Sequence, residues 1–183
     1  MITQLIEKTR QHWRKRQTAL KSPPPDLDDY PIVTTEILRF ADTDQNGHVS
    51  NAVFSVLCQS ARMEVLNDST RIEIPPGHLL PIVKLQIEFL AELHWPGTVE
   101  IGTAFNHVGC SSVGLDQVIF DTRRCVARAR STIVLIDQET RRPAPLPPTM
   151  IAQIRALFSE GVAADPRKAG LAWFVSDPRS REK

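Results

Sequence analysis

Apolar and polar residues alternate along much of the second half of the chain, which predicts β-strands. In LLPIVKLQIEFLAEL, Val83, Leu85, Ile87 and Phe89 alternate with polar residues, as in a strand with one buried face. Three further stretches, TVEIGTAFNHV, SSVGLDQVIFD and RRCVARARSTIVLID, are also strand-like and are separated by short turn signals. Short connections favour antiparallel pairing, so we expect a meander of these four strands. β-Branched residues predict an earlier strand over residues 32–40.

Residues 50–67 carry apolar side chains at helical spacing over a broad surface. We expect one long, largely buried helix, with Ser50 or Asn51 capping its start and Asn67 and Asp68 helping to end it. Such a helix is buried most easily when an antiparallel sheet wraps around it, which predicts an α+β domain in two layers. Pairing of edge strands across two chains predicts a homodimer and leaves a tetramer open.

Proline-rich stretches divide the chain into a central domain and two extensions. Residues 1–30 are predicted to form an accessory helix and a linker, because the prolines at 23–25 cannot donate backbone hydrogen bonds. Residues 31–162 are predicted to form one domain that ends in a short helix near residues 149–159. Residues 163–183 have the pattern of a loose tail.

Composition excludes several classes of partner. The 22 Lys and Arg residues nearly balance the 21 Asp and Glu residues, so no global field attracts nucleic acid or an anionic membrane. Apolar runs are of strand length, so we expect no stable membrane insertion. The 3 cysteines are widely spaced and suit a reducing compartment. We therefore expect a cytoplasmic location, and the basic residues at 10–16 leave organellar import open. Because no histidines pair at ligand spacing, we expect no metal.

Polar residues are crowded just before the predicted helix, in RFADTDQNGHVSN at residues 39–51. This stretch resembles the Asp-x-Asp-x-x-Gly-His-Val-x-Asn motif of the hotdog-fold acyl-CoA thioesterases related to 4-hydroxybenzoyl-CoA thioesterase. The Ala61-Arg62 pair and the Pro-rich segment at 137–147 also resemble this family, and the likeness covers about residues 32–155. It implies a hotdog fold, in which a curved antiparallel sheet of about five strands wraps a central helix. It also implies hydrolysis of acyl-CoA or acyl-carrier-protein thioesters without a cofactor.

The resemblance implies roles for four residues of this stretch. Asp44 matches the catalytic aspartate, either as a nucleophile or as a general base for water. The N–H near Asn51 matches the oxyanion position, where the start of a helix offers unpaired donors and a positive dipole end. Gly47 shapes the loop and tolerates a positive φ. His48 either orients Asp44, contacts substrate or is structural. Asp42, by contrast, is expected to stabilise the turn.

The family pattern also points to substrate-binding residues outside this loop. Phe54 stands where a Tyr is commoner, and Ser111 and Ser112 lie in a turn that resembles the family's. Gln59 replaces the Glu of many relatives, and Glu64 is a second candidate for a catalytic carboxylate. Four arginines could contact CoA phosphates, but a solvated strand face explains them more simply: Arg123, Arg124, Arg128 and Arg130.

Two rival functions remain open. Hotdog hydratases carry Asp-x-Asn-Pro-x-His, whereas here Gly47 replaces the proline and His48 follows Asp44 by four residues instead of five. That difference ranks enoyl-CoA hydration below hydrolysis. The second rival is a non-catalytic module that binds acyl-CoA or an acyl-carrier protein.

Overall fold

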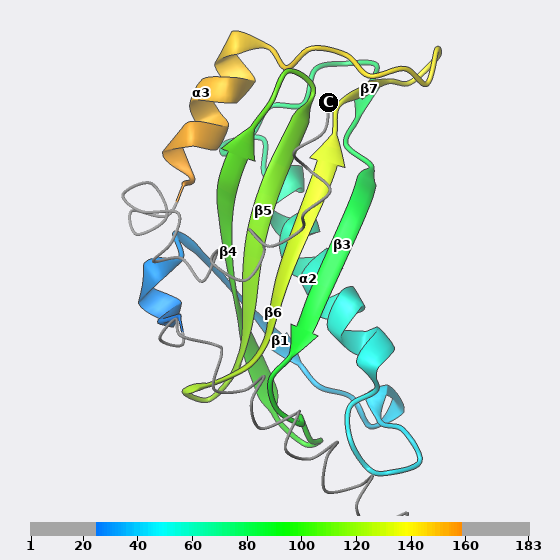
Figure 1. Cartoon of the computed structure of the whole chain (residues 1–183), viewed down its shortest axis with the longest axis vertical. Coiled ribbons are helices and arrows are strands. Elements are labelled where there is room, and N and C mark those ends of the chain that lie inside the picture. The colour runs from blue at the N-terminus through cyan, green and yellow to red at the C-terminus, as the bar shows by residue number, and fades with distance from the viewer. Residues whose placement is uncertain (1–24, 159–183) are drawn as a thin grey trace, which may run out of the picture.

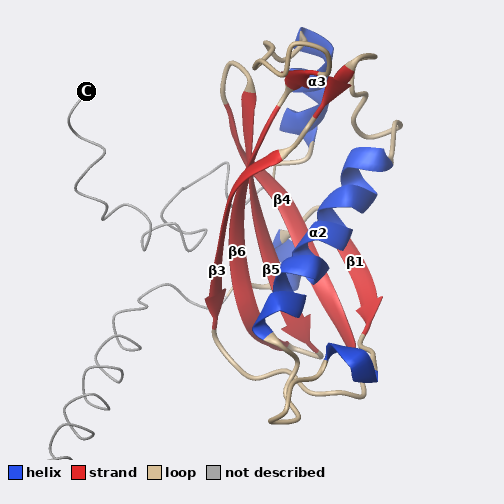
Figure 2. Ribbon diagram, turned by 90° about the vertical axis from the view of Figure 1, so that its right-hand side faces the viewer, coloured by secondary structure: helices blue, strands red, loops and turns tan. Residues whose placement is uncertain are grey.

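A computed structural model describes residues 25–158 as a long helix packed on a five-stranded antiparallel sheet (Figures 1 and 2). The helix, α2 (Asn51–Asn67), lies diagonally across one face of the sheet. The strands, in sheet order, are β1 (Ile32–Ile37), β4 (Thr98–Val108), β5 (Ser112–Asp121), β6 (Arg124–Val134) and β3 (Ile82–Phe89). The predicted α+β class and long helix are confirmed. The predicted N-terminal accessory helix lies outside the described residues, and so does the predicted C-terminal tail.

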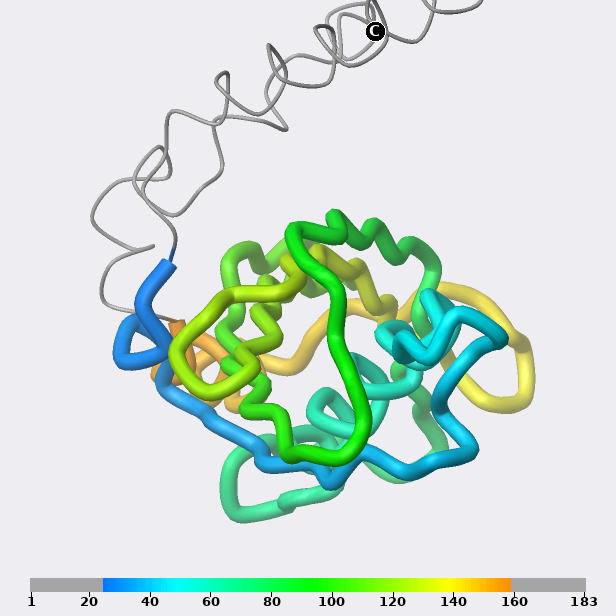
Figure 3. The backbone as a smooth tube through the Cα atoms, turned by 90° about the horizontal axis from the view of Figure 1, so that it is seen from below, coloured from blue at the N-terminus to red at the C-terminus, as the bar shows by residue number. Residues whose placement is uncertain are grey.

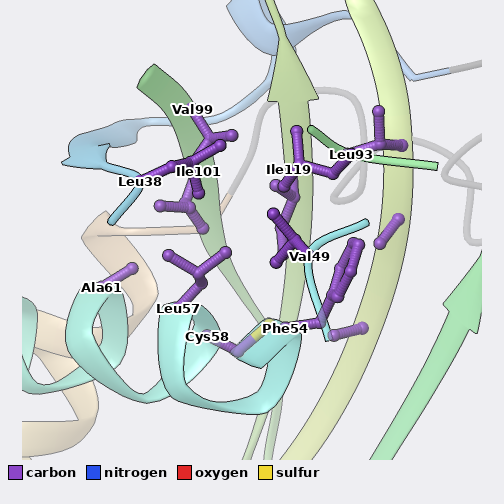
Figure 4. Packing of buried hydrophobic residues seen from close by; sticks show 13 residues of the cluster. Leu38, Val49, Phe54, Leu57, Cys58, Ala61, Leu93, Val99, Ile101 and Ile119 are labelled. Carbon is purple, nitrogen blue, oxygen red and sulfur yellow. The ribbon is translucent and has the colours of Figure 1, made fainter. Parts of the chain in front are cut away.

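The core lies between α2 and the sheet. Near the start of α2, Phe54 and Leu57 point toward Ile101 and Ile119 of the central strands (Figure 4). Each large apolar side chain buried in this way contributes about 1.5–3 kcal/mol to folding. The apolar surface predicted for residues 50–67 therefore holds the helix against the sheet.

A second core cluster lies at the other end of α2. Val65 and Leu66 pack there with Phe105 and with Met150 and Ile154. The last two belong to α3 (Pro148–Ala156), which confirms the short helix predicted near residues 149–159. Its proline at the first turn suits a helix start, because that N–H would lack a partner in any case. A two-stranded ribbon of β2 (His78–Leu79) and β7 (Ile136–Asp137) lies at the same end (Figure 1).

The predicted meander is correct for β4, β5 and β6 but wrong for β3. β3 pairs with β6, and β4 pairs with β1 and β5. Pro96 and Gly97 do not close a hairpin, because residues 90–97 cross the end of the sheet where α2 begins (Figure 3). This crossing brings residues 90–94 beside the polar stretch that precedes α2.

β3 departs from the predicted alternation because it is an edge strand. Val83 is 61% exposed at a register irregularity between Ile82 and Lys84, and Phe89 is 47% exposed at the strand end. Leu85 and Ile87 are only partly buried against the core. One edge of β3 therefore has no strand beside it among the described residues.

The end of the predicted linker is ordered against the sheet. A short 3-10 helix, η1 (Leu27–Asp29), is capped by Asp26 and leads into Tyr30. A Cβ added at Gly102 of β4 would lie 2.7 Å from Cγ of Tyr30, so only glycine leaves room for this ring. Burial raises the pKa of Tyr30. Among the described residues, no helix has the length and apolarity needed to cross a bilayer.

Candidate active site

The polar stretch before α2 folds into a tight hairpin. The N–H of Asp44 donates to the carbonyl of His48 at 2.8 Å, and the N–H of Gly47 donates to the carbonyl of Asp44 at 3.0 Å. Gly47 has φ +76°, a left-handed conformation that glycine adopts without a steric penalty. The chain reverses at this glycine, and the reversal places His48 opposite Asp44.

Asp42 fixes the hairpin to the start of α2. It belongs to a 3-10 turn, η2 (Phe40–Asp42), and its carboxylate accepts hydrogen bonds from the backbone N–H and the guanidinium of Arg39, both at 2.8 Å. These bonds hold the pKa of the Asp42 carboxyl below its usual range. Its carbonyl accepts the N–H of Ser50 at 2.9 Å. Asp42 therefore has structural partners, as the sequence predicted.

Asp44 is exposed and lines a cavity of about 680 Å³. Its Oδ1 accepts the backbone N–H of Asn46 at 2.7 Å and that of His48 at 3.3 Å. The hydrogen bond from Asn46 is the main cause of a lowered pKa, so the group is a carboxylate at neutral pH. Oδ2 has only a 3.5 Å contact with Nδ2 of Asn46, which leaves this oxygen the freer of the two.

The start of α2 leaves backbone donors unused beside this carboxylate. Of the two predicted capping residues, Ser50 occupies the N-cap position, but its side chain makes no capping hydrogen bond. The N–H of Val53 bonds to the carbonyl of Ser50, whereas the N–H of Asn51 has no hydrogen-bond partner among residues 25–158. Asn51 lines the same cavity as Asp44. An anionic oxygen in the cavity would meet this N–H and the positive end of the helix dipole.

Aromatic and aliphatic side chains form another wall of the cavity. Phe54 of α2 packs edge-to-face on Phe89 of β3, with ring centroids 5.2 Å apart. Leu90 and Ala91 continue this wall into the crossing segment. The residues lining the cavity therefore combine an apolar surface with the carboxylate-bearing Asp44 and with Asn51.

Other predicted residues lie away from this cavity. Ser111 lies in the β4–β5 turn and Ser112 is the first residue of β5, at the opposite end of the sheet from the start of α2 (Figure 1). Glu64 is exposed on α2 and does not line the cavity. Of the four arginines considered above, Arg124 alone lines it, and its guanidinium donates to the carbonyl of Glu92 at 2.9 Å.

Reasoning from the sequence missed the crossing segment as part of the site, including the ionisable residues Glu92 and His94. Glu92 and His94 line the cavity beside His48, because the crossing segment forms an antiparallel bridge between His48 and His94. Linear spacing could not pair two histidines this far apart in the chain. The available signal was the position of Glu92 and His94 on either side of Leu93, which places both on the face opposite this buried residue.

Comparison with known proteins identifies the family. The sequence profile of the Thioesterase-like superfamily matches residues 38–154, well over half of the chain. The chain belongs to this superfamily. The matched region begins just before the Asp44 hairpin and ends within α3. A search of curated proteins found no significant match.

Solved structures of the superfamily's fold are similar to this chain. The PA5185 protein of Pseudomonas aeruginosa superposes with a TM-score of 0.69 at 23% identity, covering 75% of this chain and 99% of its own. Slr0204, a 1,4-dihydroxy-2-naphthoyl-CoA thioesterase from Synechocystis, has a TM-score of 0.59 at 24% identity over 68% of this chain and 96% of its own. SAV2348 from Staphylococcus aureus, solved in complex with CoA, has a TM-score of 0.62 at 15% identity, covering 69% of this chain and 82% of its own. The predicted hotdog fold is confirmed.

Proposed function

We propose that this member of the thioesterase-like superfamily hydrolyses acyl-CoA or acyl-carrier-protein thioesters to a free acid and a thiol. The observation that carries the proposal is that one cavity is lined both by Asp44, which bears a carboxylate, and by Asn51, whose backbone N–H has no hydrogen-bond partner in the described part of the chain. Thioester hydrolysis needs both an attacking or base group and a donor for the oxygen that becomes negative. No other carboxylate of the cavity belongs to the hairpin that precedes α2.

Two routes use these groups. In the first, Asp44 takes a proton from water, and the resulting hydroxide adds to the carbonyl carbon. In the second, a carboxylate oxygen of Asp44 adds to that carbon and forms an anhydride, which water then hydrolyses. In both routes the carbonyl oxygen gains negative charge toward the N–H of Asn51, the C–S bond breaks, and the thiolate leaves and is protonated. Gly47 and His48 shape the loop that carries Asp44.

The cavity supports an acyl group with apolar character. Phe54 and Phe89 would contact the acyl chain, and Arg124, which also lines the cavity, would attract an anionic part of the substrate. A CoA complex and a naphthoyl-CoA thioesterase among the similar folds support a CoA-type thioester as the donor.

A homodimer would complete the site. Ile82 and Val83 on the open edge of β3 are 40% and 61% exposed, which suits pairing with a second copy of β3. Antiparallel pairing about a twofold axis turns the partner end over end. Its β4–β5 turn would then lie at the end where α2 of the first chain begins. We propose that Ser111 and Ser112 contact substrate in the partner's cavity through this arrangement.

Thiol release from a panel of acyl-CoA substrates of different chain length tests the proposal. Wild-type protein should release free thiol, and Asp44→Asn should lower turnover by at least about 100-fold because it removes the attacking or base group. Asp137→Asn is the matched control, since Asp137 also accepts a backbone N–H of its own turn, from Thr140 at 2.7 Å, but lies outside the cavity.

Three outcomes would contradict the proposal. Tight binding of acyl-CoA without thiol release would indicate the non-catalytic module. Loss of enoyl-CoA absorbance without thiol release would indicate a hydratase. Equal turnover of wild type and Asp44→Asn would remove Asp44 from the mechanism.

A further inference from the structure

Three potential metal ligands meet at the rim of the cavity, supplied by two segments far apart in the sequence. Nε2 of His48 lies 3.7 Å from Oε2 of Glu92, and Nε2 of His94 lies 3.8 Å from the same oxygen. The ligand atoms of the three residues all lie within 4.8 Å of one another. We propose that His48, Glu92 and His94 bind a divalent transition-metal ion of the Zn²⁺ class.

The separations suit such an ion after small side-chain rotations. Ligand atoms about 2.0 Å from a tetrahedral Zn²⁺ are about 3.3 Å apart. The two distances to Glu92, 3.7 and 3.8 Å, exceed this value by about 0.5 Å, and the ligand nitrogens of the two histidines lie within 4.8 Å of each other. The side chains of His48 and His94 are 36% and 55% exposed, so their rings can turn. Two imidazoles and one carboxylate form a ligand set that Zn²⁺ uses in proteins. Three protein ligands would leave a fourth position open toward the cavity.

The backbone already holds the ligand-bearing segments together. The N–H of Val49 donates to the carbonyl of Leu93 at 2.8 Å, next to the bridge between His48 and His94. Leu93 is 1% exposed and is anchored in the core near Val49 (Figure 4). Because side chains alternate along an extended segment, burying Leu93 turns its two neighbours to the opposite side. Binding of an ion would therefore require little further ordering of the two backbone segments.

The charges lining the cavity favour a cation. With neutral imidazoles, the charged lining residues are Asp44, Glu92 and Arg124, which gives two negative groups against one positive. The guanidinium of Arg124 is also engaged, by the carbonyl of Glu92 at 2.9 Å and by a carboxylate oxygen of Asp121 at 3.5 Å. A bound ion would neutralise the remaining negative charge beside the hairpin of Asp44.

This metal site is separate from the proposed hydrolysis. Neither route through Asp44 and the N–H of Asn51 uses an ion, so either proposal can fail while the other stands. The test is therefore ion binding and not turnover. It uses the full chain after treatment with a chelator, with Cys110→Ser as the parent, because Cys110 is an exposed thiol that could bind Zn²⁺ itself.

Titration with Co²⁺, followed by its visible absorption, and with Zn²⁺, followed by calorimetry, gives the affinity. The parent should bind one ion at this site, and His94→Ala and Glu92→Gln should each weaken binding by at least about tenfold, because each removes or neutralises a ligand. His107→Ala is the matched control, since His107 is exposed and outside the cluster, and it should bind like the parent.

Two results would overturn the metal site. One is a parent protein that binds neither ion. The other is a folded Glu92→Gln or His94→Ala variant, checked by circular dichroism, with the affinity of the parent. Glu92→Gln keeps the shape of the side chain, so it remains informative even if His94→Ala disturbs folding.

Discussion

The two ends of α2 differ in packing: one end lies in a closed apolar core, and the other borders a cavity. At the far end, α3 covers the sheet, and the fully buried Met150 and Ile154 close an apolar core. At the starting end, the Asp44 hairpin and the crossing segment surround a cavity instead of filling it. There the cap is incomplete, and the N–H of Asn51 has no hydrogen-bond partner in the described part of the chain.

Because of this difference, one end of α2 contributes mainly to folding stability and the other carries the groups available for chemistry. Unpaired donors and an exposed carboxylate contribute little to folding, but they are the groups that a substrate can use. The closed end contributes burial of apolar side chains from α2, β4 and α3. Substitutions at the closed end should therefore change the free energy of unfolding, and those at the open end should change turnover.

The largest effect on stability is expected from Ile154→Ala. Ile154 is 1% exposed in the core under α3, so truncation should lower the free energy of unfolding by about 2–5 kcal/mol. Denaturant unfolding measures this loss, and Ile154→Val should cost only about 0.5–1.5 kcal/mol. Turnover per folded molecule should stay near wild type. A selective loss of turnover would show that the two ends are coupled.

The next effect is expected at the open end, from Asn51→Pro. Proline is tolerated at the first position of a helix, and Ser50 before it already has φ −58° and ψ 140°, which proline permits. The substitution removes the proposed oxyanion donor, so kcat should fall by about 100- to 1000-fold with little change in stability. Asn51→Ala keeps the N–H and should retain most activity. Equal kcat values for the two variants would contradict the role of this N–H.

A smaller, paired effect is expected at two glycines with positive φ. Gly47 and Gly77 have φ +76° and +73°, and a Cβ at either would meet no atom within 4 Å. Alanine at each should therefore cost a similar amount, about 1–2 kcal/mol, through backbone strain alone. Gly47→Ala should also lower turnover, because it shifts the hairpin of Asp44, whereas Gly77→Ala should not. Similar turnover in both would make the shape of the hairpin unimportant.

The smallest effect is expected from blocking thiols. Burial raises the pKa of Cys58 on α2 to about 12, so its thiolate is scarce at neutral pH. In a Cys110→Ser background, treatment with a thiol reagent should change turnover by less than about twofold. Mass spectrometry of the treated protein would show whether Cys58 reacted. Rapid loss of activity with label on Cys58 would contradict its burial.

The sequence predicted the features that depend on local pattern. Helical spacing from Val53 to Leu66 located α2, because one apolar stripe must face the core. Turn-forming residues and the motif located the hairpin of Asp44 and Gly47 before the helix. These features need only neighbours in the chain, and the structure has them where the pattern placed them.

Features that depend on long-range pairing were not predicted. No local sequence signal shows whether β3 pairs with β6 or with β4. Because β3 pairs with β6, it is an edge strand, and Val83 and Phe89 are exposed. The same crossing brings Glu92 and His94 to His48, so the full polar lining of the cavity could be seen only in the folded chain.

A crystal structure with a non-hydrolysable ketone analogue of acyl-CoA would test the central geometry most directly. The ketone oxygen should lie about 3 Å from the backbone nitrogen of Asn51, with an Asp44 oxygen facing the carbonyl carbon directly or through one water. An analogue whose ketone lies outside this cavity, or points away from both groups, would contradict the assignment.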